Sequence, residues 1–315
     1  MSQHSPIQWC DSTVNPVMGC DGCELWQRPE LPNARRSCFA GVQHQFRGGN
    51  PGWAKRFEVV EQFPGRMAQA ARWSDLTGHP RADKPWLHHL PRVIFISDMG
   101  DALSKAVPFE FLLHEIIRHV SSPAGSRHRW LWLTKQPKRM AKFSEWLREL
   151  GVEWPPNLWA GASLTMRGNA DLRISWLLDV GDERTQHFLS IEPQVAHHGH
   201  ELKSWDVRLK GKIAWIIQGG ESGKDARPFA LTWAAAMQTF AQDIGAKYFL
   251  KQLGRNAVLY PGPRAPALQL RDPHGGDWEE WPIPLRIREV PGVEYSHSRH
   301  YQLRDIEMIA ARRAS

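Results

Sequence analysis

Three cysteines that could bind a metal lie in one early segment of this 315-residue chain. They are Cys20, Cys23 and Cys38, and the one remaining cysteine, Cys10, stands apart from them. A C-x2-C pair brings two thiolates within reach of one metal, and a third thiolate from a following turn leaves one coordination position open. The spacing therefore predicts a metal or iron-sulfur site in the loop 20–38, with Cys10 as a structural thiol.

Three interpretations of this loop remain open. A zinc site would add His44 as the fourth ligand and would need no other group. An iron-sulfur cluster on three thiolates would leave one iron free, the arrangement that permits reductive cleavage of S-adenosylmethionine. In the third interpretation the thiols bind nothing, which their clustering disfavours.

The rest of the sequence predicts the elements that would position such a site. Short apolar runs recur, and each is followed by a polar or glycine-bearing turn and then by helical spacing. The predicted strands cover residues 93–97, 130–133, 158–163, 187–191, 213–218 and 247–250. The predicted helices cover residues 109–119, 138–150, 170–178 and 231–244. This alternation predicts an α/β fold with a parallel sheet, either doubly wound or closed as a (β/α) barrel or partial TIM-like barrel.

In either arrangement, function gathers at the carboxyl ends of the strands. Polar residues cluster there, and they include Asp101 and Thr134. Our candidates for catalysis are Asp98, Lys135, Glu192 and Lys251. Our candidates for cofactor binding are Ser163, Gly219, Gly220, Glu221 and Ser222. Helix capping would explain any one of these residues equally well, but their repetition at six strand ends favours function.

The glycine-rich turn 219–223, G-G-E-S-G, allows a ligand to approach the backbone closely, and Glu221 could accept from an amine or hydroxyl. The turn lacks both the G-x-G-x-x-G spacing of a dinucleotide site and the Gly-Lys-Ser/Thr of a phosphate loop. The sequence therefore argues against those two cofactors.

Composition and charge narrow the class of protein. The N-terminus has no basic region followed by an apolar run, and no stretch reaches membrane-spanning length. We expect a cytoplasmic protein without a membrane partner. The formal net charge of +7 favours polyanionic partners such as nucleic acid. The alternation fades after Gly254, which predicts a barrel domain over residues 1–254 and a C-terminal extension over residues 255–315 that packs on it.

Taken together, the motifs resemble a bacteriophage-associated family of unknown function, also found in bacterial genomes, that is known for W-N-P-V-x-G-C near its start. Residues 14–20, V-N-P-V-M-G-C, correspond to that motif. The resemblance covers nearly the whole chain. It continues through residues 38–40, 95–101, 133–137, 188–193, 219–223 and 251–254.

That family resembles a distant branch of the radical S-adenosylmethionine barrels, although the usual cysteine spacing there is C-x3-C-x2-C. The resemblance implies a 4Fe-4S cluster on Cys20, Cys23 and Cys38, with S-adenosylmethionine chelating the open iron. It also implies an electron donor and hydrogen abstraction from a substrate in the barrel mouth.

Charge and the phage association favour a nucleic acid or nucleotide as that substrate. The first rival is a zinc-stapled nucleic-acid-binding protein without catalysis. The second is a metal-free barrel enzyme that processes sugars or nucleotides.

Overall fold

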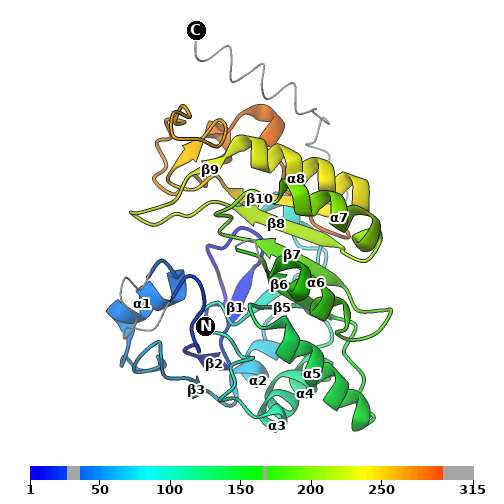
Figure 1. Cartoon of the computed structure of the whole chain (residues 1–315). Coiled ribbons are helices and arrows are strands. Elements are labelled where there is room, and N and C mark those ends of the chain that lie inside the picture. The colour runs from blue at the N-terminus through cyan, green and yellow to red at the C-terminus, as the bar shows by residue number, and fades with distance from the viewer. Residues whose placement is uncertain (27–35, 166–168, 294–315) are drawn as a thin grey trace. The chain divides into compact units, whose positions relative to one another are not determined.

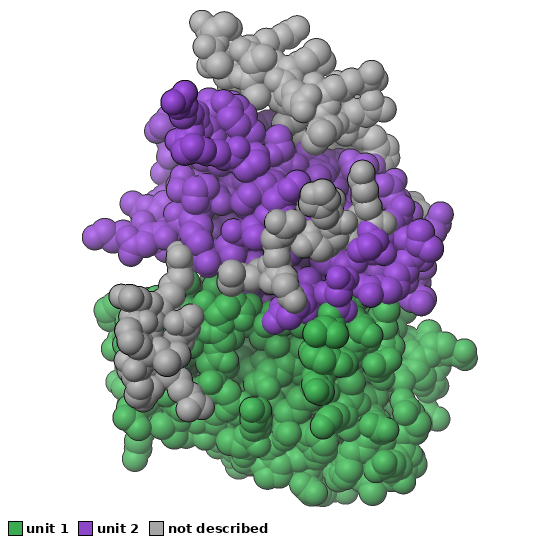
Figure 2. All heavy atoms as spheres, viewed as in Figure 1, with its two compact units in different colours: residues 1–162, 172–187 green, residues 163–171, 188–315 purple. Residues whose placement is uncertain are grey.

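The computed structural model describes residues 1–26, 36–165 and 169–293. The chain divides into two compact units (Figure 2). Unit 1 contains residues 1–162 and 172–187, and unit 2 contains residues 163–171 and 188–315. Each unit is described by itself below.

Seven strands form the main sheet, in the order β1-β4-β5-β6-β7-β8-β10 (Figure 1). Within this sheet, every pair of neighbouring strands that belong to the same unit is parallel. The strands are β1 (Ser12–Val14), β4 (Val93–Ile96), β5 (Arg129–Thr134), β6 (Leu158–Ser163), β7 (His187–Ile191), β8 (Trp215–Gly219) and β10 (Lys247–Gln252). The predicted α/β fold with a parallel sheet is therefore confirmed, whereas closure into a barrel stays a prediction.

Unit 1 is built around β1, β4, β5 and β6 (Figure 1). All four residues of β4 are buried, and Trp130 and Trp132 of β5 are fully buried, as the apolar runs predict. The helices that follow these strands are α3 (Phe109–Leu112), the π-helix η2 (Leu113–Ile117), α4 (Arg118–Ser121), α5 (Pro137–Glu149) and α6 (Ala170–Leu178).

Between β1 and β4 lie the elements that frame the cysteines. They are β2 (Val17–Met18), α1 (Phe39–Arg47), β3 (Glu61–Gln62), α2 (Arg66–Ala71) and the short η1 (Pro85–Leu87). β2 pairs with β3 in antiparallel fashion. β1 was not among the predicted strands, because three residues are too few to display a pattern.

Unit 2 contains β7, β8 and β10 together with helices α7 (Gly199–Leu209) and α8 (Leu231–Ile244). The short β9 (Phe229–Ala230) pairs with β11 (Ala257–Val258), and the chain continues through η3 (Trp278–Glu280) and η4 (Ile283–Leu285). The segment after residue 254 contacts β10, since Leu250 N donates to Ile287 O at 2.9 Å. The domain boundary at residue 254 stays a prediction, and residues 294–315 of the predicted extension lie outside the described residues.

None of the helices in the described residues is long and apolar enough to cross a membrane.

Candidate functional site

A buried asparagine joins the ends of β1 and β4. Val14 pairs with Ile96, and Asn15 follows directly. The Asn15 side chain donates from Nδ2 to Asp98 Oδ1 at 2.5 Å and accepts at Oδ1 from Met99 N at 2.9 Å. Asn15 therefore fixes the turn that carries the predicted catalytic residue Asp98.

Burial raises the pKa of Asp98 above its usual value. Hydrogen bonds from Asn15 and Thr13 and the nearby Met1 amino group oppose this rise without reversing it. A carboxyl group held this way retains its proton to a higher pH than an exposed aspartate.

Gly19 guides the chain from β1 into the cysteine loop. Its backbone has a φ of +88°, and a Cβ atom there would lie 2.2 Å from the carbonyl oxygen of Val59. Gly19 forms a bridge with Gly100, and Asp101 N donates to Gly19 O at 3.3 Å. Only glycine satisfies both the left-handed backbone and this close approach.

Asp101 organises the ends of β4 and β5. Its buried carboxylate accepts from Thr134 Oγ1 at 2.8 and 2.9 Å, from Leu103 N at 3.0 Å and from Lys135 N at 3.1 Å. Burial raises the pKa of Asp101 even though these donors and the Lys135 charge stabilise the ionised form. The predicted catalytic Lys135 thus lies beside Asp101.

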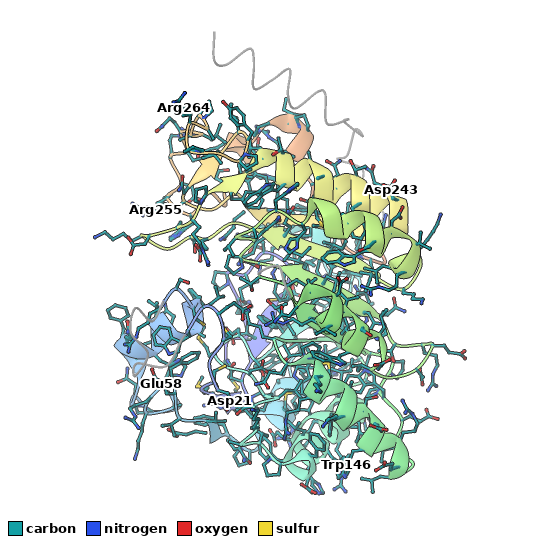
Figure 3. All side chains as sticks on the ribbon, in the orientation of Figure 1. Asp21, Glu58, Trp146, Asp243, Arg255 and Arg264 are labelled. Carbon is teal, nitrogen blue, oxygen red and sulfur yellow. The ribbon has the colours of Figure 1, made fainter. Side chains whose placement is uncertain are left out.

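Backbone hydrogen bonds hold all three cysteines. Cys20 N donates to Phe57 O at 2.8 Å, Cys23 N donates to Trp26 O at 3.2 Å, and Cys38 N donates to Leu25 O at 3.1 Å. Residues 27–35 of the predicted loop lie outside the described residues. Asp21 and Glu58, labelled in Figure 3, lie in the same part of unit 1 as α1.

The three thiols are electrostatic neighbours of one another. Cys23 and Cys38 both raise the pKa of Cys20, and Cys38 raises that of Cys23. The largest cause of both shifts is burial; Asp101 adds to it at Cys20, and Lys135 opposes it at Cys23. All three cysteines are half-buried free thiols. The predicted metal ligands therefore lie in the same part of unit 1.

An apolar wall lies behind these thiols. Trp26, Ala40 and Phe57 form a buried cluster against which Cys20 and Cys38 pack. Cys10, in contrast, is fully buried, and burial raises its pKa to about 12. That environment suits the structural role predicted for Cys10.

Two acidic residues near the start of the loop, Asp21 and Glu24, anchor it. Asp21 accepts from Ser104 Oγ at 2.7 Å and from Lys105 N at 2.8 Å. Burial would raise the Asp21 pKa, but the hydrogen bonds from its partners outweigh burial and lower it. Glu24 forms a bidentate ion pair with Arg173, in which Nη1 donates to Oε1 at 3.1 Å and Nη2 donates to Oε2 at 3.2 Å.

His44, the fourth ligand in the zinc interpretation, is buried on α1. Its Nδ1 lies 2.8 Å from Ala40 O, and its ring packs against Trp53 and Phe57, each at a centroid distance of 5.1 Å. Its Nε2 is buried and has no hydrogen-bond partner among the described residues. A histidine that bonds a carbonyl through one nitrogen keeps the other free for a metal.

The donor set fits a thiophilic metal or an iron-sulfur cluster, since three neighbouring thiols are soft ligands. Their side chains are not arranged as a closed site: within the described residues, no group of three or more His, Cys, Asp or Glu side chains could hold a metal ion. Binding would therefore require the thiols to converge.

Unit 2 brings together a second set of predicted residues. Lys251 Nζ donates to Glu192 Oε1 in a partly buried ion pair. Gly219 lies beside them, because a Cβ there would be 3.5 Å from Glu192 Cγ and 3.3 Å from Gln252 Cγ. The two predicted catalytic residues of this unit thus neighbour the first predicted cofactor-binding glycine.

The other predicted cofactor-binding residues of unit 2 have structural partners. A Cβ at Gly220 would lie 2.3 Å from Leu253 O. Both carboxylate oxygens of Glu221 bond to the Arg227 side chain, at 2.9 and 2.5 Å. Ser222 is half-exposed, and Ser163 is buried at the end of β6. Their roles toward a cofactor stay predictions.

One buried network in unit 2 was missed by the sequence interpretation. Tyr248 OH donates to Gln218 Oε1, and Gln218 Nε2 donates to Gln194 Oε1. The sequence does contain a signal for this network. Gln218 ends the apolar run 213–218, and a polar side chain in a buried strand needs a hydrogen-bond partner.

The fold and the thiol cluster define an α/β protein with a parallel sheet and a three-cysteine loop in unit 1. A family model described as a protein of unknown function (DUF5131) matches residues 4–282. The chain therefore belongs to the DUF5131 family. Neither the curated proteins nor the solved structures contain a match to it.

Proposed function

We propose that this protein is an iron-sulfur enzyme of the radical S-adenosylmethionine type, with a 4Fe-4S cluster held by Cys20, Cys23 and Cys38. The observation that carries the proposal is the proximity of three half-buried thiols: Cys20 and Cys38 pack against the same buried cluster, and Cys38 raises the pKa of both Cys20 and Cys23. Three thiolates leave one iron of such a cluster open to the amino and carboxylate groups of S-adenosylmethionine, and the bound cluster supplies one electron for its reductive cleavage.

The residues around the loop serve this chemistry by position and charge. Asp21 and Glu24 anchor the loop between its cysteines, so that the thiols are supported from both sides. The Lys135 charge stabilises ionised Cys23, and Trp26 and Phe57 give Cys20 and Cys38 an apolar surface to pack against. Asp98 and Lys135 are the proposed catalytic residues of unit 1.

The remaining parts of the proposal concern the fold, the substrate and unit 2. We take the parallel strands as a partial (β/α) barrel and a nucleic acid or nucleotide as the substrate, in keeping with the net charge of +7. An external electron donor completes the reaction. Glu192 and Lys251 form the proposed catalytic pair of unit 2.

A specific observation favours one second candidate, a zinc-stapled nucleic-acid-binding protein. His44 Nε2 is buried without a hydrogen-bond partner among the described residues, which suits a nitrogen that ligates zinc. In that case Cys20, Cys23, Cys38 and His44 would complete a tetrahedral site.

Substitution of His44 separates the two candidates. We expect His44→Ala, purified without oxygen, to retain iron and sulfide, because the cluster uses only thiolates. Each of Cys20→Ser, Cys23→Ser and Cys38→Ser should lose most of the metal. Cys10→Ala is the matched control and should retain it, since Cys10 lies in the core.

Iron, sulfide and zinc are quantified per chain for every variant, and circular dichroism verifies folding. Loss of zinc from folded His44→Ala, in a protein that never contained sulfide, would establish the second candidate instead.

A further inference from the structure

Exposed cations lie on α1 and on the segments directly before and after it. Residues 36–57 contain Arg36, Arg47, Lys55 and Arg56 but no Asp or Glu. All four side chains are exposed, and none forms an ion pair with a carboxylate among the residues that the structure describes. The segment itself is therefore positively charged, although Glu58 follows it directly and Glu61 Oε1 accepts from Lys55 N at 2.7 Å.

Two large aromatic rings stand on the same helix. Phe39 is 61% exposed and Phe46 is 78% exposed, whereas Ala40, Gly41 and His44 form the buried face of α1. Seven positions correspond to about two helical turns, so the two rings share a face and lie about 10 Å apart along the axis. Since other residues hold α1 in place, these rings are available to a partner.

Arg47 is one of the exposed cations and also contacts an aromatic ring. It ends α1, and its guanidinium lies over the Trp53 ring at 5.6 Å from the ring centroid. A cation positioned on an aromatic ring has fewer orientations to lose when it binds an anion. The exposed turn at residues 48–52 follows directly and contains three glycines.

We infer that one surface of unit 1, here named the α1 surface, binds single-stranded nucleic acid. It consists of Phe39, Phe46, Arg36, Arg47, Lys55 and Arg56. Cations without carboxylate partners suit phosphates, and exposed rings suit unpaired bases, which a duplex keeps stacked inside. Polar Gln43 lies between the rings on this face, four positions after Phe39 and three before Phe46, so the apolar face is too narrow for a lipid surface. This inference deepens the proposed function, because it rests on the nucleic-acid partner named there.

The test is fluorescence anisotropy with labelled 20-nucleotide DNA and RNA strands, the matched duplexes, and anionic phospholipid vesicles as a third probe. We expect tighter binding to single strands than to duplexes. Comparison of the DNA and RNA strands shows which of the two nucleic acids the protein prefers. Phe46→Ala should weaken single-strand binding about tenfold, since stacking on one ring contributes about 1–3 kcal/mol. Arg47→Gln with Arg56→Gln should reduce the slope of log Kd against log salt by about 0.7 per lost phosphate contact.

Two controls match these variants. Val207→Ala removes an equally exposed apolar side chain from α7, and Lys142→Gln removes an exposed charge from α5. Neither should change binding. The inference is overturned if Phe46→Ala binds single strands as the parent does, if duplexes bind as tightly as single strands, or if only vesicles bind.

Metal analysis of the same samples keeps this inference separate from the proposed enzyme. A protein that assembles its cluster but binds no oligonucleotide refutes the α1 surface and leaves the cluster intact. A protein that binds single strands through Phe46 but contains neither iron nor sulfide refutes the enzyme and retains the α1 surface.

Discussion

Burial is the largest influence on four ionisable groups in the cysteine loop and after β4. It raises the pKa values of Cys20, Cys23, Asp98 and Asp101, and the hydrogen bonds that these groups accept oppose the shifts without reversing them. The thiols of Cys20 and Cys23 are therefore protonated at neutral pH in the absence of metal. Metal binding must release those protons, so the affinity of the loop for metal should increase with pH.

The raised pKa of Asp98 predicts a pH dependence of stability. The folded state holds the Asp98 proton more tightly than the unfolded state does, so the contribution of Asp98 to the unfolding free energy is highest at low pH. It should decrease as the pH rises from the ordinary aspartate range of about 4 through the raised value.

Denaturant titrations at several pH values test this dependence. We expect Asp98→Asn to make the decrease smaller, with the share of Asp101 remaining, while Asp243→Asn, at an exposed position labelled in Figure 3, should leave the decrease unchanged. An identical pH profile for Asp98→Asn and the parent protein would refute the assignment.

At the scale of elements, residues after β4 and on α6 hold the first described arm of the cysteine loop. Gly19 bridges Gly100, Asp21 bonds Ser104, and Glu24 pairs with Arg173. These contacts fix this arm to residues that are far away in sequence. The positions of the thiols therefore depend on the surrounding elements more than on local propensity.

Two glycines in unit 1 allow a test of this attachment. Gly19 and Gly49 have similar positive φ values of +88° and +81°, but only Gly19 has backbone atoms where a Cβ would lie. Gly49→Ala should lower the unfolding free energy by about 1–2 kcal/mol, the cost of a left-handed backbone. Gly19→Ala should lower it by a further ~1–3 kcal/mol, because the added methyl group meets Val59 O.

Urea titrations measure both values, and metal content should decrease for Gly19→Ala alone. Equal destabilisation by the two substitutions would mean that the close approach of Gly19 to Val59 does not constrain the loop.

At the scale of the whole molecule, the parallel α/β sheet could be predicted because buried parallel strands appear as continuous apolar runs, as at residues 93–96. The proximity of the three thiols could be predicted from the spacing of their cysteines in the sequence. The partners of Asp21 and Glu24 could not, because Ser104 and Arg173 are brought close only by the fold. Asn15 was part of a quoted motif, but its role depends on the register of β1 and β4.

The second unit illustrates the same limit. The turn after β8 was predicted to bind a cofactor because glycines permit close approach. In the structure, Gly220 is approached by Leu253 O, and Glu221 binds Arg227. Sequence spacing cannot distinguish approach by a ligand from approach by the chain itself.

The central claim is that the three-thiol loop holds an iron-sulfur cluster with one open iron. The most direct test is electron paramagnetic resonance of the reduced, anaerobically purified protein with and without S-adenosylmethionine, together with iron, sulfide and zinc quantitation. We predict about four irons and four sulfides per chain, as a 4Fe-4S cluster requires, and a signal that changes when S-adenosylmethionine is added. Stoichiometric zinc without sulfide would contradict the claim.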